Sequence, residues 1–113
     1  MEEGAWVREL KAAITVCDRE GVTLEMNDRA AQTHEKDGGR ELIGRSLVEC
    51  HPEPARSHLL ELLRTGQPNV YTIEKAGVKK LIYQAPWFQG GEYKGFVELS
   101  LPIPFDLPHF VRE

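Results

Sequence analysis

The stretch from Asp18 to Pro54 decides the fold of this chain. It reads DREGVTLEM (Asp18–Met26), then NDRAA (Asn27–Ala31), ELIGRSL (Glu41–Leu47) and CHPE (Cys50–Glu53). The first segment predicts a turn and a strand. The next three predict a capped helix, a helical turn ended by glycine, and a corner before a longer helix. We therefore expect a hairpin followed by a block of short helices.

The hairpin is predicted from the residue types on both sides of the turn. Ala13–Cys17 is rich in β-branched residues, which favour a strand, and Gly21 can take the positive φ that the turn needs. Val22, Leu24 and Met26 then alternate with polar residues, which is the pattern of a half-buried strand with these three side chains inward.

The helical block begins after that strand. Asn27 is predicted to be an N-cap, because its side chain can accept a backbone N–H of the first turn. A longer helix is expected to begin at Pro52 or Pro54 and to end at Gly66. Its apolar positions recur at helical spacing and form the inner face: Ala55, Leu59, Leu62 and Leu63.

The remainder of the chain predicts β-structure. Three segments, Asn69–Lys75, Val78–Trp87 and Tyr93–Leu101, carry alternating apolar and polar residues and are separated by glycine-containing turns. Prolines 102, 104 and 108 are expected to end the last strand, because proline has no N–H to donate. Five strands around short helices predict an α+β domain with one antiparallel sheet.

Composition narrows the function classes. The chain has 113 residues, 41% hydrophobic and 28% charged, as in one soluble globular domain. Its net charge is −4 and its basic residues are scattered, so nucleic acid is not an expected partner. No apolar run reaches the roughly 18 residues of a membrane span. Cys17 and Cys50 lie far apart in a chain with no secretion signal, which predicts two free thiols and a cytoplasmic location.

The order of these elements resembles the PAS family over residues 12–103. The motifs that carry the resemblance are NDRAA at the start of the helical block, then Leu42–Gly44, and then Cys50–Pro52 before the long helix. Together with Glu92–Leu99, they are most similar to small bacterial PAS proteins and to PAS modules attached to hemerythrin-like domains. The resemblance implies a five-stranded sheet of order 2-1-5-4-3, with short helices and one longer helix over one face. Leu47 stands where flavin photoreceptor PAS domains carry a reactive cysteine, so covalent flavin photochemistry is not expected.

The resemblance also implies a pocket between the long helix and the sheet. Periodicity supplies its expected lining: His58, Leu59, Leu62, Leu63, Tyr71, Ile73, Leu81, Tyr83, Val97 and Leu99. A mostly apolar cavity of this kind would take a flat or aliphatic ligand with one or two polar groups. His58 resembles the proximal histidine of haem-binding PAS sensors in lying on this helix, which makes haem one candidate cofactor.

Residues 1–11 are expected to form an amphipathic helix, and residues 104–113 a proline-rich tail. Trp6, Leu10 and Ala13 follow the spacing of one helical stripe. An exposed indole needs a partner surface, either its own domain or a second subunit. We therefore name these three residues as the candidate interface of a homodimer.

No constellation for catalysis is evident, since the chain has no Gly-x-Ser-x-Gly motif, phosphate loop or pair of carboxylates that can be placed in one cleft. Cys50 and His51 are adjacent but lack the second pair of a zinc site, so no metal site is expected. The sequence predicts a non-enzymatic sensory PAS module that binds a small molecule or a partner protein and signals by protein contact. The alternatives are an interaction module without ligand and a haem-based gas or redox sensor.

Overall fold

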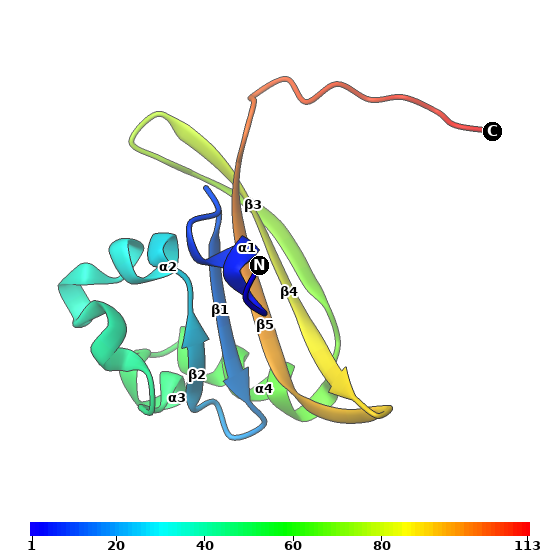
Figure 1. Cartoon of the computed structure of the whole chain (residues 1–113). Helices are drawn as coiled ribbons and strands as arrows, with labels where there is room; N and C mark the ends of the chain where they lie inside the picture. Colours follow the sequence, from blue (N-terminus) through cyan, green and yellow to red (C-terminus); the bar gives the residue numbers. More distant parts are fainter.

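The structure is a computed structural model that describes residues 1–113. One five-stranded antiparallel sheet of order β2-β1-β5-β4-β3 forms its centre, as predicted. The strands are β1 (Ala13–Asp18), β2 (Thr23–Met26), β3 (Asn69–Lys75), β4 (Val78–Gln89) and β5 (Glu92–Ile103). The helices between β2 and β3 lie along one side of the sheet, and the C-terminal tail extends away from it (Figure 1).

The helical elements are short except for the last one. They are α1 (Ala5–Arg8), α2 (Asp28–Thr33), the 3-10 helices η1 (Glu35–Asp37) and η2 (Gly39–Leu42), α3 (Leu47–Cys50) and α4 (Ala55–Thr65). None of them is long and apolar enough to span a membrane. The N-cap role of Asn27 is confirmed, because its Oδ1 accepts the N–H of Ala30 at 3.0 Å. Gly66 ends α4 in the left-handed conformation, with φ of 67°.

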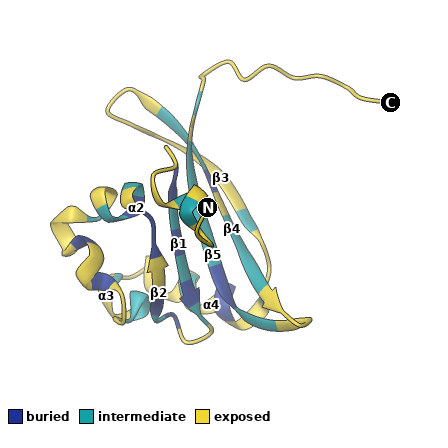
Figure 2. Ribbon diagram, in the orientation of Figure 1, coloured by how far each residue is buried: buried dark blue, intermediate teal, exposed yellow.

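Two small apolar clusters form the core between the helices and the sheet. Ala13, Met26, Ala30 and Leu42 join β1 and β2 to α2 and η2, while Cys17, Leu62, Leu63 and Phe96 join β1 and β5 to α4. Figure 2 shows buried segments on the central strands and an exposed tail. Both cysteines are free thiols, with Cys17 buried and Cys50 exposed.

The N-terminal helix differs from the prediction. It covers only Ala5–Arg8, and Ala13 is the first residue of β1 rather than part of a stripe with Trp6 and Leu10. Ala13 pairs with Ser100 and is buried in the first cluster, so strand pairing prevails over the local helical spacing. Ala13 therefore cannot contribute to a surface with Trp6, which is 65% exposed.

Two strand details also differ from the prediction. A register shift between Val16 and Cys17 breaks the alternation on β2, so Thr23 is buried and Leu24 is exposed. Strand β5 continues through Pro102 to Ile103. Pro102 pairs with Lys80 on β4, whereas the pairing of β5 with β1 ends at Ser100. Pro102 therefore lies where β5 is an edge on the β1 side, a place where sheets tolerate proline.

Candidate functional site

Helix α4 creates the site because only part of its inner face is packed. Leu62 and Leu63 lie against Cys17 and Phe96 in the core. One turn earlier, Leu59 packs against this cluster but is only partly buried, and α4 leaves a space between itself and β3. The space below this turn is a cavity between α4 and the sheet.

The cavity has a volume of about 630 Å³. Its apolar lining comes from the start and inner face of α4, and its polar lining comes mostly from three strands of the sheet. The complete lining is His51, Pro54, Ala55, His58, Leu59, Leu62, Asn69, Tyr71, Gln84 and Glu98. A smaller hollow of about 90 Å³ adjoins it and shares four residues: His51, Leu59, Gln84 and Glu98.

Four polar residues cross the sheet in register on the face that α4 covers. Thr15 on β1 pairs with Glu98 on β5, Glu98 pairs with Gln84 on β4, and Gln84 pairs with Asn69 on β3. Residues that pair directly across strands share one face, so these side chains form a continuous row. We call Thr15, Glu98, Gln84 and Asn69 the polar row.

Hydrogen bonds fix the orientation of the polar row. Gln84 Nε2 donates to Glu98 Oε1 at 2.7 Å, and Asn69 Nδ2 donates to Gln84 Oε1 at 2.8 Å. Asn69 Nδ2 also lies 3.4 Å from His58 Nε2. Since a carboxylate only accepts hydrogen bonds, Glu98 determines which way both amides point.

The remaining polar groups of the cavity include a histidine whose tautomer is fixed. His51 Nδ1 donates to the carbonyl of Leu47, so in the neutral ring Nε2 has a free lone pair. Burial raises the pKa of Tyr71, and the charge of Glu98 raises it further. Burial likewise raises the pKa of Cys17, and Glu98 is among the carboxylates that add to this rise. The field in this region is therefore negative.

The structure brings together part of the predicted pocket. His58, Leu59, Leu62 and Tyr71 line the larger cavity. Leu63 is instead buried in the core, with 6% of its surface exposed. Ile73 lies on the same face of β3 as Tyr71, beyond the residues that line the cavity.

The predicted residues on β4 and β5 lie on the other face of the sheet. Leu81 pairs with Leu101, Tyr83 with Leu99 and Ala85 with Val97, whereas the cavity face carries Gln84 and Glu98. Val97 still borders the smaller hollow. Alternation predicts that the apolar positions of these strands point inward, but the register places the neighbouring polar positions at the cavity. The cavity therefore combines the predicted apolar wall of α4 with a polar wall from the sheet.

The predicted pocket lacked two lining residues at the start of α4, Pro54 and Ala55, and four polar lining residues, Asn69, Gln84, Glu98 and His51. A usable signal was present, because Gln84 and Glu98 are polar residues within long strands otherwise rich in apolar side chains. A polar residue within a half-buried strand lies either on the solvent face or in a polar site. Only the pairing register distinguishes the two.

The arrangement gives no support to haem ligation by His58 or to a metal ion held by several side chains. A haem iron needs the lone pair of a histidine nitrogen, and the Nε2 atom of His58 faces the amide of Asn69. No group of three or more His, Cys, Asp or Glu residues is placed to hold a metal ion. Cys50 and His51 do not converge, because His51 points its Nδ1 at the Leu47 carbonyl.

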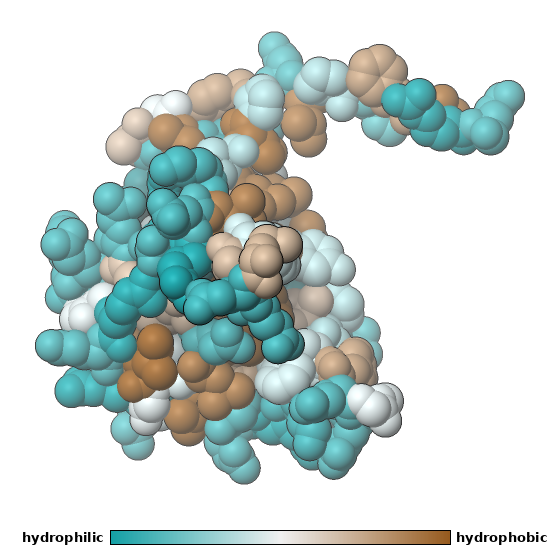
Figure 3. Space-filling model, in the orientation of Figure 1, coloured by the Kyte–Doolittle hydropathy of each residue, from teal (hydrophilic) through white to brown (hydrophobic).

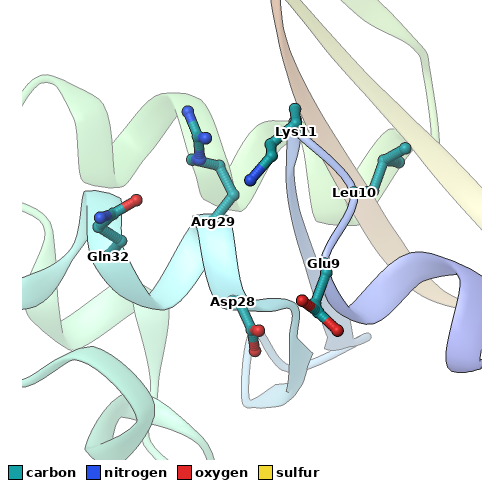
Figure 4. A pocket seen from close by; sticks show the side chains of 6 residues that line it. All are labelled: Glu9, Leu10, Lys11, Asp28, Arg29 and Gln32. Carbon is teal, nitrogen blue, oxygen red and sulfur yellow. The ribbon is translucent and has the colours of Figure 1, made fainter.

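A second hollow, of about 230 Å³, lies between the α1–β1 connection and α2. Its lining residues are Glu9, Leu10, Lys11, Asp28, Arg29 and Gln32. In Figure 4 these side chains spread along both elements and do not surround a common centre. The α4 cavity is therefore the better candidate site.

Comparison with known proteins agrees with this fold. The PAS fold family matches residues 7–73, which is more than half of the chain. The chain belongs to the PAS family. A search of curated proteins finds no match.

Solved structures of low sequence identity share the PAS fold. A C-terminal domain from Streptococcus mutans superposes with a TM-score of 0.68 at 21% identity, covering 86% of this chain and 79% of that one. A PAS–haem oxygen sensor, the Aer2 receptor of Vibrio cholerae, gives 0.59 at 19% identity, covering 83% and 96%. The PAS domain of the histidine kinase ThkA gives 0.60 at 16% identity, covering 80% and 97%.

Proposed function

We propose that this chain is a sensory signalling module that binds a small molecule in the α4 cavity and passes on the bound state by protein contact. The observation that carries the proposal is the cavity itself, where Leu59 on one wall faces Gln84 and Glu98 on the other. Binding pockets typically combine apolar walls with a few placed polar groups. The likeness to a receptor and to a sensor kinase domain supports a sensory role. The role is binding rather than catalysis.

Native mass spectrometry of freshly purified protein tests this function. A retained ligand appears as an additional mass, and a visible absorption spectrum identifies or excludes haem. The variant Leu59→Trp should fill the cavity and remove the additional mass without loss of stability, since Leu59 borders open space. In a filled core the same change would cost about 1–3 kcal/mol. A destabilised variant, together with a protein that retains no ligand and responds to no compound in a thermal-shift screen, would favour an interaction module without ligand.

The outer face of the sheet supports a homodimer as the route of protein contact. Opposite α4, the side chains of Ile14, Leu99, Tyr83 and Val70 form an apolar row across four strands. Tyr83 is 40% exposed and Val70 52% exposed. Figure 3 views the molecule in the orientation of Figure 1 and shows hydrophobic side chains beside and below the N-terminal segment. Helix α1, which carries Trp6, lies over the same face.

Sedimentation velocity at micromolar concentration tests the dimer. We expect a dimer for the parent protein and weaker association for Trp6→Ala. Phe105→Ala is the matched control, since Phe105 is an exposed aromatic residue outside the sheet. A monomeric parent protein, or equal weakening by both substitutions, contradicts an interface at Trp6.

A further inference from the structure

The cavity contains a carboxylate without a counter-ion. The ion pairs of the structure are Arg8–Glu2, Arg40–Asp28, Arg64–Glu61 and Lys94–Glu92. Glu98 is in none of them, and no lysine or arginine lines either the cavity or the adjoining hollow. One oxygen of Glu98 accepts from Gln84, and the other has no hydrogen-bond partner.

The hydrogen bonds of the polar row leave acceptors facing the cavity. Gln84 uses one of its two amide N–H groups on Glu98, and Asn69 uses its amide N–H groups on Gln84 and His58. The acceptors that remain are the second oxygen of Glu98, the oxygen of Asn69 and the Nε2 lone pair of His51. The donors that remain are the second amide N–H of Gln84 and, in the neutral ring, the Nδ1–H of His58. Tyr71 can both donate and accept. Because acceptors outnumber donors here and Glu98 is a carboxylate, a ligand that supplies donors and positive charge complements this wall.

The wall of the cavity opposite the polar row determines the chemistry of the rest of the ligand. Ala55, Leu59 and Leu62 of α4 present an apolar surface to the same cavity. A purely polar cation such as a hydrated metal ion would leave this wall exposed to water, and the lining offers no cluster of metal ligands. A cationic head joined to an apolar body complements both walls.

On the basis of the ligand-binding function proposed above, we propose that the cavity binds an organic cation with an ammonium or amidinium head and a small apolar body. Glu98 is the counter-ion of the head, and Gln84 holds Glu98 in place. The apolar body lies against Leu59 and Leu62. Charge-assisted hydrogen bonds of this type are shorter and stronger than neutral ones, which gives the site selectivity for cations.

Three probes with one apolar body and different heads test the inference: phenethylamine, 2-phenylethanol and phenylacetate. Each is titrated into ¹⁵N-labelled full-length protein and followed by NMR. We expect the amine to bind at least about tenfold more tightly than the alcohol, as for a hydrogen bond to a charged group, and phenylacetate to bind most weakly. The side-chain amide signals of Gln84 and Asn69 should shift with the amine, because both amides belong to the polar row.

Glu98→Gln should reduce amine binding to the level of the alcohol. Glu74→Gln is the matched control, because it removes the same charge from an exposed site on the outer face and should leave the preference intact. If Glu98→Gln does not fold, the parent protein alone still tests the cation inference, through the order of the three probe affinities and the shift of the Gln84 side-chain signal. Equal binding of all three probes in the cavity overturns the cation inference while the ligand site stands. No shift of cavity signals at millimolar amine also overturns it, whereas native mass spectrometry decides the ligand-binding function separately.

Discussion

Asn27 provides the sharpest test of how the N-terminal segment, the sheet and the helices are joined. Its side chain is 5% exposed. Oδ1 accepts the N–H groups of Ile14 and Ala30, each at 3.0 Å, and Nδ2 donates to the carbonyls of Ala12 at 2.8 Å and Val7 at 3.0 Å. One amide thus satisfies four backbone groups in α1, the segment before β1, β1 and α2. Asn27→Ala removes all four bonds.

The expected cost follows from which partners lose access to water. The bonds to Ala12 and Ala30 are buried, while those to Ile14 and Val7 are partly buried and can be replaced by water. Loss of an N-cap costs about 1 kcal/mol, and an unsatisfied buried carbonyl costs about 1–3 kcal/mol. We therefore expect Asn27→Ala to lower the free energy of unfolding by about 2–4 kcal/mol, a large share of the total for a domain of this size.

Urea unfolding followed by circular dichroism measures this loss as a lower midpoint at unchanged slope. Asn27→Asp should also destabilise the protein, because it keeps both accepted bonds but sets a buried carboxylate oxygen against the carbonyls of Ala12 and Val7. Ser46→Ala is the control for a solvent-accessible cap, since Ser46 Oγ accepts only the N–H of Glu49 at 3.3 Å, and it should cost about 0.5–1 kcal/mol. If Asn27→Ala costs no more than Ser46→Ala, the four bonds do not hold these elements together and the reasoning is wrong.

Three further predictions concern packing, thiol reactivity and tyrosine titration. Gly95→Ala should unfold the protein or lower its free energy of unfolding by more than about 3 kcal/mol, because the new Cβ would lie 2.0 Å from the Cys17 carbonyl oxygen. Gly90→Ala is the control: nothing lies within 4 Å of its new Cβ, so only the positive φ should cost stability, roughly 1–2 kcal/mol. Thermal unfolding measures both changes. A disulfide-exchange reagent should modify Cys50 quickly and Cys17 only on unfolding, because burial raises the pKa of Cys17; two fast thiols in the native protein contradict this. Glu98→Gln should lower the pKa of Tyr71 but not that of Tyr93, as measured by NMR titration of the tyrosines. In the parent protein, Tyr71 of the unfolded chain loses its proton at a lower pH than Tyr71 of the folded chain. The free energy of unfolding should therefore fall as pH rises from the ordinary tyrosine pKa near 10 to the raised pKa.

Periodicity identified the strands of this fold but could not assign their faces. On β4 and β5, residues of both faces are partly buried, so the apolar residues do not mark the inner face. Tyr83 and Leu99 therefore indicated the wrong side, while Gln84 and Glu98 carried the site. The N-cap at Asn27 and the end of α4 at Gly66 were predictable, because each depends on a residue's own backbone and local hydrogen bonds.

For a related reason, the local sequence could not predict where β1 begins or which side chains of β2 point inward. Ala13 fits a helical stripe in sequence, but its pairing with Ser100 comes from a segment more than eighty residues away. Leu24 fits an inward position by alternation, but the register shift beside Cys17 reverses it. Both errors occur where non-local pairing overrides a local pattern.

Because side chains alternate along β4 and β5, the proposed ligand cavity and the proposed dimer surface lie on opposite faces of the same two strands. Gln84 and Glu98 line the cavity, and their sequence neighbours Tyr83 and Val97 lie on the outer face. A ligand that shifts the strand backbone at Glu98 would therefore also shift the proposed dimer face, with no need for a long helical transmission path. If ligand binding and dimerisation are coupled in this way, thermodynamic linkage requires the coupling to be reciprocal. The factor by which phenethylamine changes the dimer dissociation constant must equal the factor by which dimerisation changes the affinity for phenethylamine. Sedimentation with and without saturating phenethylamine tests the coupling itself, and an unchanged dimer dissociation constant would exclude it.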